Sequence, residues 1–219
     1  MKFLIEGKVS FGYIVPAQDF GYRFLEVVEY HNWQSQDTND NVSFCTDTKF
    51  ARDQLQTNCV PVGSIQFCQS WYAQMGLKEV PPLNVPENLW PLVKREVFVS
   101  SHFKDNGAKY FGKDIKVIKA PWNGVYSEYA GEPMFFTEMI TDVAAEWRLF
   151  VLQGDIVDAR CYLGDRWQLP NRKYCEEAAR KYGKQNPSFT LDVFVRKNGV
   201  TDILECHDFF ACGLYHVAA

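Results

Sequence analysis

Apolar and polar residues alternate in two stretches near the C-terminus, FTLDVFVRK and VTDILECHDF, and Asn198-Gly199 lies at the junction between them. Alternation with a period of two is typical of strands that bury one face. Asn-Gly between such stretches favours a two-residue type I′ turn, because both central residues of that turn need positive φ. We therefore predict a β-hairpin in which Lys197 pairs with Val200 and Asp192 lies opposite Glu205.

Two facing carboxylates on this hairpin indicate a cation site. Cross-strand neighbours have Cβ atoms about 5 Å apart, where like charges destabilise a sheet, so neutralising Asp192 or Glu205 should not harm the metal-free protein. His207 shares the face of Glu205. Mg²⁺ prefers oxygen ligands, so we predict a metal site at Asp192, Glu205 and His207. The alternative is a surface hairpin with solvated acids. The alternation assigns the opposite, apolar face to Leu191, Val193, Val195, Leu204 and Cys206.

The rest of the chain predicts mainly strands, with two clear helices. An apolar period predicts a helix from Ser64 to Gly76, and NRKYCEEAARKYG predicts a second, which Asn171 can cap and Gly183 can end. Stretches rich in β-branched and aromatic residues predict strands over REVFVSS, AKYFGKDIKVI, MFFTEMI and EWRLFVLQGDIVDARCYLG, the last with a turn at Gly154. Strands interrupted by isolated helices favour an α+β architecture.

The length and the proline pattern predict two domains. A chain of 219 residues can form one large or two small domains. The stretch PPLNVPENLW is too rich in proline for regular structure and predicts a linker. Strand-like sequence begins at Arg95, so we expect an N-terminal domain over residues 1–94 and a second domain over residues 95–219.

Composition excludes several classes of protein. A hydrophobic content of 47% indicates a globular chain, and a net charge of −4 disfavours binding to nucleic acid through its phosphates. The N-terminal apolar run contains Glu6 and Lys8, which argues against a signal peptide, and no stretch is long enough for a membrane span. We expect a cytoplasmic protein that binds neither nucleic acid nor membrane.

Cysteine usage is typical of reduced, buried thiols. The chain has 7 cysteines, an odd number, with no CxxC motif. Cys206, His207, Cys212 and His216 are an alternative zinc set. However, Cys206 and His207 are adjacent on a predicted strand and should point to opposite faces.

Three lysines in FGKDIKVIKAPWNG indicate an anion site. On a strand, Lys113 and Lys119 share a face and Lys116 points away. Two ammonium groups on one face suit a polyphosphate. The alternative is a solvated edge strand that lysines protect from aggregation.

Arg148 interrupts the apolar strand EWRLFV and faces away from Trp147 and Leu149. It needs an anionic partner, because a guanidinium cannot shed its charge. The partner is either a structural acid such as Glu146 or a phosphate oxygen, which fits the planar guanidinium. The preceding stretch FTEMITD ends in Thr141-Asp142, where backbone groups could contact a base and the carboxylate a ribose.

Together these motifs resemble a family. The order Lys…Lys, TEMI, EWRLFV, a strand Asp and E-x-[N/H] resembles the ATP-grasp fold, in particular a clade marked by one arginine and two lysines that includes a eukaryotic translation-initiation-factor assembly protein. The resemblance covers residues 95–219, where GDIVDARCYLGD and FFACGLYHV are also similar to the sequence pattern of this family. Residues 1–94 are then the subdomain that precedes the ATP-grasp domain, whose two subdomains clamp ATP.

The resemblance implies roles for the residues that match. Lys113 and Lys119 hold the nucleotide phosphates, and Arg148 faces the γ-phosphate or an acyl-phosphate. Lys119 and Arg148 are thus the catalytic candidates. The hinge Glu138, Met139 and Ile140 contacts adenine, mostly through its backbone; with Asp142, Lys113, Lys119 and Arg148 it forms the expected nucleotide-binding set.

Asp192 and Glu205 match the acids that bind Mg²⁺ in this family, and two neighbouring positions depart from its pattern. His207 stands where the family usually has Asn, which implies either tolerance of Mn²⁺ or a changed role for residue 207. Asp114 stands where relatives often have Pro, so the choice between Lys116 and Lys119 stays open.

The implied activity is ATP-dependent carboxylate–amine ligation. A carboxylate attacks the γ-phosphate to give an acyl-phosphate and ADP, and an amine then displaces phosphate. Either substrate can belong to a peptide or protein. The alternative is a non-catalytic, ATP-binding assembly factor for a protein partner. A zinc-binding interaction module built on the Cys/His set is a third class.

Overall fold

The computed structural model describes residues 2–35, 41–78, 81–104 and 107–208. The chain forms two compact units, Met1–Val80 and Pro81–Ala219. Cys212 and His216 of the alternative zinc set, and the FFACGLYHV stretch, lie outside the described residues.

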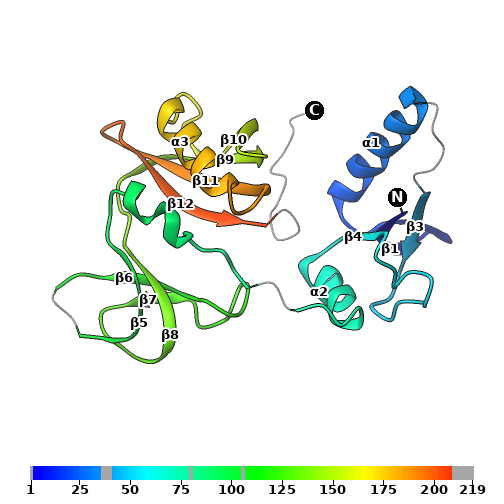
Figure 1. Ribbon diagram of the computed structural model, residues 1–219, viewed down its shortest axis with the longest axis horizontal. Coiled ribbons are helices and arrows are strands. Elements are labelled where there is room, and N and C mark those ends of the chain that lie inside the picture. The colour runs from blue at the N-terminus through cyan, green and yellow to red at the C-terminus, as the bar shows by residue number, and fades with distance from the viewer. Residues whose placement is uncertain (1, 36–40, 79–80, 105–106, 209–219) are drawn as a thin grey trace. The chain divides into compact units, whose positions relative to one another are not determined.

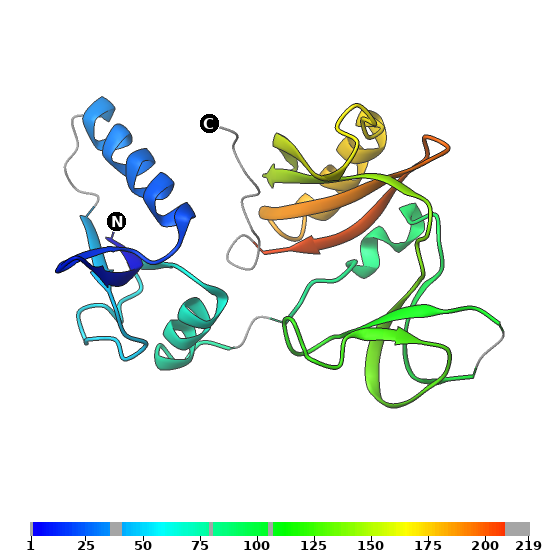
Figure 2. The ribbon, with the colours of Figure 1, turned by 180° about the vertical axis from the view of Figure 1, so that it is seen from behind.

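The described residues of the first unit form a small sheet with two helices (Figures 1 and 2). Strand β1 pairs antiparallel with β2 and parallel with both β3 and β4. Ser64 caps α2 by accepting a 3.2 Å hydrogen bond from the Phe67 amide, and Gly76 has a φ of +69° just beyond the helix, as the sequence predicts. The elements are β1 (Lys2–Ser10), β2 (Tyr13–Pro16), α1 (Asp19–Ser35), β3 (Asn41–Cys45), β4 (Cys59–Val62) and α2 (Ile65–Gln74).

Residues 81–104 and 107–208 of the second unit form two antiparallel sheets (Figure 1). One has the strand order β5-β8-β6-β7 and the other β10-β9-β11-β12, with α3 packed on one face of the latter. The elements are η1 (Glu87–Leu92), β5 (Val97–Phe103), β6 (Tyr110–Asp114), β7 (Gly124–Tyr126), β8 (Tyr129–Glu138), β9 (Val143–Leu152), β10 (Asp155–Gly164), α3 (Arg172–Gly183), β11 (Ser188–Arg196) and β12 (Thr201–His207).

The main core of the second unit lies between its β9–β12 sheet, α3 and the segment before β5. Leu149 of β9 and Ala178 of α3 are buried there with Val85 and Leu89 of the proline-rich stretch. That stretch is therefore not a free linker: it packs into the second unit. The predicted boundary between residues 94 and 95 accordingly differs from the observed division between residues 80 and 81.

The C-terminal hairpin forms as predicted but with a different turn. Thr190, Leu191 and Asp192 pair with His207, Cys206 and Glu205 in the predicted register. Nearer the turn the register shifts, so that Val193 pairs with Ile203. The Arg196 amide donates to the Val200 carbonyl, and Gly199, at φ +83°, is in the left-handed region whereas Asn198 is not. The type I′ prediction is wrong, because three residues form the loop instead of two.

A β-bulge explains why Asp192 still faces Glu205. The longer loop shifts the register by one residue, and an extra residue on β12, Leu204, shifts it back between Ile203 and Glu205. The bulge also turns Leu204 away from the apolar face to which the alternation assigned it, and its side chain lines a cavity instead. The two shifts therefore cancel at the acids, and Ile203 takes the place in the apolar core that the alternation assigned to Leu204.

Candidate active site

A cavity of about 460 Å³ in the second unit gathers most of the predicted site residues. Its walls come from both sheets of the unit, from the loop after β6 and from the segment 81–84. A volume of this size is within the usual range of about 300–1,000 Å³ for small-molecule sites. The charged and polar lining residues are Asn84, Lys113, Asp114, Lys119, Asn123, Glu146, Arg148, Tyr162, Asp192, Glu205, His207 and Asp208.

The predicted metal ligands converge in this cavity. One ligand atom from each of Asp192, Glu205 and His207 lies within 4.8 Å of the others. Two carboxylates and one imidazole suit a divalent cation, with oxygen ligands favouring Mg²⁺ and the nitrogen favouring Mn²⁺. The donor set therefore fits the metal that the sequence predicts.

Arg148 has a protein partner that the sequence did not identify. Its Nε and Nη2 donate to the two carboxylate oxygens of Asp192 at 2.8 and 2.7 Å, on the neighbouring strand β11. The side chains of Arg148 and Asp192 are only 3% and 1% exposed. Burial raises the pKa of Asp192, and the hydrogen bonds and charge of Arg148 oppose that rise. Asp192 is thus a structural partner of Arg148, in place of the Glu146 that the sequence suggested.

Glu205 is likewise held by basic groups. The Lys113 ammonium group forms an ion pair with one carboxylate oxygen, and His207 Nε2 lies 3.0 Å from the other. Burial alone would raise the pKa of Glu205, but the hydrogen bond from His207 and the charge of Lys113 outweigh it and lower that pKa. His207 Nε2 also lies 3.9 Å from Asp192 Oδ2.

These pairs overturn the expected like-charge penalty. Asp192 faces Glu205 as predicted, but Arg148 compensates the first acid and Lys113 the second. Neutralising either acid in the metal-free protein would therefore leave a base without its partner, which is destabilising. The sequence located the acids correctly and missed the bases that already neutralise them.

The lysine segment reaches the cavity by a route other than the predicted strand. Strand β6 ends at Asp114, and Lys119 lies in the following loop with a φ of +55°. Lys113 and Lys119 both line the cavity, whereas Lys116 forms an exposed 3.4 Å ion pair with Glu132. Lys113 and Lys119 therefore do not share a strand face, which was the predicted reason for grouping them. The cavity is nevertheless lined by these two lysines and not by Lys116.

The predicted adenine hinge does not line the cavity. Glu138, Met139, Ile140 and Asp142 are absent from its walls. The Glu138 and Met139 amides donate to the carbonyls of Glu96 and Lys109, and Asp142 forms a 2.6 Å ion pair with Arg196. Two of the backbone N–H groups that were expected to contact adenine thus already donate to carbonyls of the protein.

Glu146 and Tyr162 enter the cavity without having been predicted as site residues. Glu146 precedes Arg148 by two residues on β9 and therefore shares its face. Burial raises the pKa of Glu146, a hydrogen bond with Tyr162 lowers it, and the charges of Asp192 and Glu205 raise it. The Tyr162 hydroxyl also lies 3.4 Å from Asp192 Oδ2. Strand alternation around Arg148 was the signal that could have identified Glu146.

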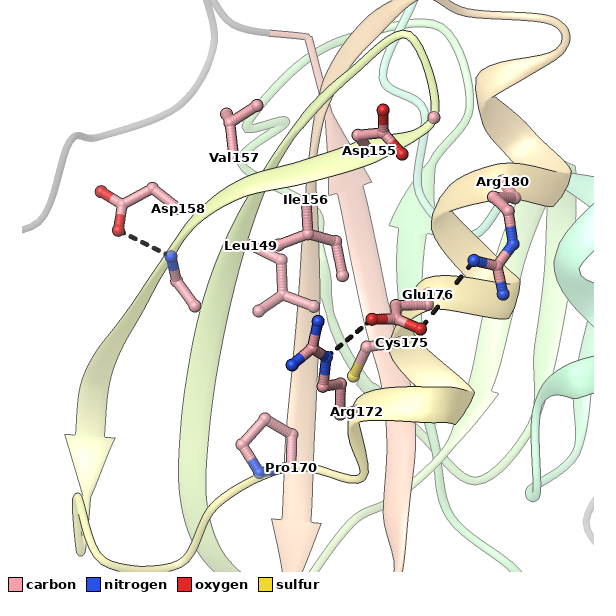
Figure 3. Close-up of a pocket in the computed structure, with 12 residues that line it drawn as sticks. Leu149, Asp155, Ile156, Val157, Asp158, Pro170, Arg172, Cys175, Glu176 and Arg180 are labelled. Atoms are coloured by element: carbon pink, nitrogen blue, oxygen red, sulfur yellow. Dashed lines mark hydrogen bonds and ion pairs between the residues drawn. The ribbon is translucent and has the colours of Figure 1, made fainter.

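A second cavity, of about 580 Å³, lies on the α3 side of the same sheet (Figure 3). Leu149 lines it, and the adjacent Arg148 lines the first cavity, as alternation along a strand requires. Its charged wall on α3 is an ion-pair ladder in which Glu176 lies 2.7 Å from Arg172 and 3.8 Å from Arg180. None of the predicted site residues lines this cavity, so the first one is the candidate active site.

A family model described as "ATP-grasp domain, R2K clade family 2" matches residues 85–219, which is more than half of the chain. The chain belongs to the ATP-grasp superfamily. The predicted α+β, ATP-grasp fold is thereby confirmed. A search of curated proteins gave no match.

Solved structures agree on the fold. A RimK domain protein ATP-grasp from Sphaerobacter thermophilus DSM 20745 is similar over 96% of this chain and 92% of its own, with a TM-score of 0.53 and 10% identity. The macrocyclase MdnC from Microcystis aeruginosa MRC, bound with precursor peptide MdnA, is similar over 97% of this chain and 92% of its own, with a TM-score of 0.50 and 12% identity.

Among the described residues of this ATP-grasp protein, no helix is long and apolar enough to cross a membrane.

Proposed function

We propose that this ATP-grasp protein is an ATP-dependent carboxylate–amine ligase that forms an acyl-phosphate and releases ADP and phosphate. The observation that carries the proposal is the cavity itself. It combines an acidic cluster of candidate metal ligands, Asp192 and Glu205 with the neighbouring His207, with the basic residues Lys113, Lys119 and Arg148. Acids for a divalent cation next to bases for phosphate oxygens are the combination that phosphoryl transfer needs.

The bases act by positioning and by charge. Lys119 comes from the loop after β6 and Lys113 from β6 itself, and both line the cavity in which the phosphates would bind. Arg148 is held by both oxygens of Asp192, which fixes its guanidinium in the wall of the site. Fixed positive charge of this kind stabilises negative charge that develops during transfer, without reorganisation.

The acids would hold the metal. Asp192 and Glu205 would supply carboxylate oxygens and His207 a nitrogen to Mg²⁺ or Mn²⁺, which when bound neutralises charge on phosphate oxygens. Lys113 forms an ion pair with one carboxylate oxygen of Glu205, so a cation bound at that oxygen would compete with the ammonium group. An ammonium group displaced in this way would be available to phosphate, which would couple metal binding to nucleotide binding.

Glu138, Met139, Ile140 and Asp142 remain the proposed contacts of adenine and ribose. Because two of their amides donate to protein carbonyls, the remaining backbone groups of the hinge would contact adenine.

The test has two stages. ATP with Mg²⁺ or Mn²⁺ should raise the melting temperature, because a ligand that binds only the folded state adds about 2.7 kcal/mol at a hundredfold excess over Kd. ADP release should then appear with the correct substrates. Candidate amino acids and peptides are the first to screen, because a protein of similar fold was solved with a precursor peptide. No thermal shift would refute the nucleotide assignment; a shift without ADP release across the screen would favour the assembly-factor alternative.

A further inference from the structure

Asp114 organises the loop that carries Lys119. Its Oδ1 accepts hydrogen bonds from the amides of Lys116 and Val117 at 2.5 and 2.7 Å, and its Oδ2 accepts one from Trp122 Nε1 at 2.7 Å. The amide of Asp114 donates to Asn123 Oδ1 at 2.7 Å. One side chain thus holds both ends of the loop, before and after Lys119.

The same residue ties this loop to the strand of the acidic cluster. Asn84 Nδ2 donates to the Asp114 carbonyl at 3.2 Å, and the Asn84 carbonyl accepts from the Cys206 amide at 2.6 Å. Cys206 lies between Glu205 and His207 on β12. A continuous set of hydrogen bonds therefore connects the loop after β6 to the predicted metal ligands.

Lys119 needs such support because its backbone is strained. A φ of +55° is the left-handed region, which costs a residue other than glycine about 1 kcal/mol or more unless its surroundings impose it. A free loop would relax this conformation and move the ammonium group from the cavity wall. The hydrogen bonds of Asp114 hold the loop on both sides of Lys119.

We propose that Asp114 is a positioning residue that holds Lys119 at the phosphate end of the cavity. The inference rests on the proposed function, since it takes ATP as the ligand of the cavity. Asp114 remains ionised at neutral pH: burial would raise its pKa, but the hydrogen bonds from the amides of Lys116 and Val117 and from Trp122 outweigh it and lower that pKa. An ionised acceptor makes stronger hydrogen bonds than a neutral one.

A double-mutant cycle on ATP affinity tests the assignment. Calorimetry with ATP and Mg²⁺ would compare the wild type, Asp114→Ala, Lys119→Ala and the double mutant. Each single change should raise Kd about tenfold, which is the loss expected for one charge-assisted contact. The double mutant should bind no more weakly than Lys119→Ala, because Asp114 acts only through Lys119. Glu132→Gln, which removes the exposed partner of Lys116, is the matched control and should leave Kd unchanged.

Amide exchange supplies an independent readout of the loop. In Asp114→Ala the amides of Lys116 and Val117 should exchange faster while those of β6 keep their protection, which also shows that the variant folds. Unchanged exchange or unchanged Kd in Asp114→Ala, or additive losses in the double mutant, would overturn the positioning role while ATP binding by the wild type stands. If the wild type itself fails to bind ATP, the proposed function fails and this inference fails with it.

Discussion

Two buried Arg–Asp pairs in the second unit have the same chemistry and different surroundings. Arg148–Asp192 and Arg95–Asp202 join side chains that are at most 3% exposed, at 2.7 and 3.0 Å. The first pair lines the candidate active site together with Glu205 and His207. The second pair lies outside that cavity. Burial and ion pairing alone therefore do not distinguish a functional arginine from a structural one.

The neighbours of the second pair explain its role. Arg95 donates to Thr137 Oγ1 on β8 at 2.7 Å and to the carbonyls of Ile203 and Leu204 on β12. Asp202 accepts from the Lys94 amide at 3.0 Å and from the Tyr174 hydroxyl at 3.1 Å. The pair thus joins the two sheets and α3 of the second unit through contacts within the protein. An arginine surrounded by protein acceptors is structural, and one that faces a cavity with further acids can serve a ligand.

The largest expected effect is on stability at the structural pair. Arg95→Ala leaves Asp202 buried without its counter-ion and removes the donor to two carbonyls, so it should destabilise the fold by about 3–5 kcal/mol, as breaking buried pairs does. Urea unfolding followed by circular dichroism measures this. A loss below 1 kcal/mol would mean that Arg95 is not the link between the sheets.

The second prediction separates the two pairs. Arg148→Ala should cost about 3 kcal/mol, the lower end for a broken buried pair. Burial raises the pKa of Asp192 and Arg148 opposes that rise, so removing Arg148 raises the pKa of Asp192 further. The variant then loses more stability than the wild type when Asp192 ionises in the folded state. The deficit should therefore be smallest at acid pH and should grow as pH rises. A deficit independent of pH would contradict this account.

Replacing each whole pair sharpens the comparison. Arg148→Met with Asp192→Leu should recover most of the lost stability, because apolar residues can replace a buried ion pair, and should abolish stabilisation by ATP. The matched double change, Arg95→Met with Asp202→Leu, should not recover stability, since Thr137 and the β12 carbonyls lose their donor. Equal recovery in both would show that the two pairs do not differ as proposed.

A smaller effect is expected at Glu205. Its pKa is lowered in the folded state, so its stabilising contribution is present above the unfolded pKa and is lost as pH falls through the folded one. Glu205→Gln should destabilise the metal-free protein by about 1–3 kcal/mol at neutral pH. The difference from the wild type should vanish on acidification. Stability curves at several pH values measure this, and a more stable variant at neutral pH would restore the like-charge account.

The smallest effect on stability is expected at the loop lysines. Lys119→Ala and Lys116→Ala should leave the urea midpoint unchanged, because Lys116 is exposed and neither lysine lies in the core. Only Lys119→Ala should weaken ATP binding, since Lys119 lines the cavity and Lys116 does not. Equal losses of affinity would mean that net charge near the site matters and position does not.

Local sequence patterns predicted much of the fold. Asn171 accepts from the Tyr174 amide at 3.1 Å to cap α3, which ends at Gly183 as expected. Alternation identified β11 and β12 and placed Asp192 opposite Glu205. Such patterns act over a few residues, so a sequence displays them directly. The type I′ turn was wrong because loop length and the bulge are set by how both strands pack, which a dipeptide does not encode.

By itself the sequence identified the acids and the arginine of the candidate site, because charged residues that interrupt apolar alternation are visible along the chain. It also named the two lysines that line the cavity, although Lys119 lies in a loop and not on the predicted strand. Only the tertiary structure decided their partners. Arg148 and Asp192 are 44 residues apart, and Lys113 and Glu205 are 92 apart, so each pair exists only once the sheets have assembled. The buried network of Arg95 was likewise not apparent from the sequence. The sequence shows which residues are charged, but only the folded structure shows which opposite charge neutralises each of them. In the low-dielectric interior this pairing determines whether a buried charge is tolerated.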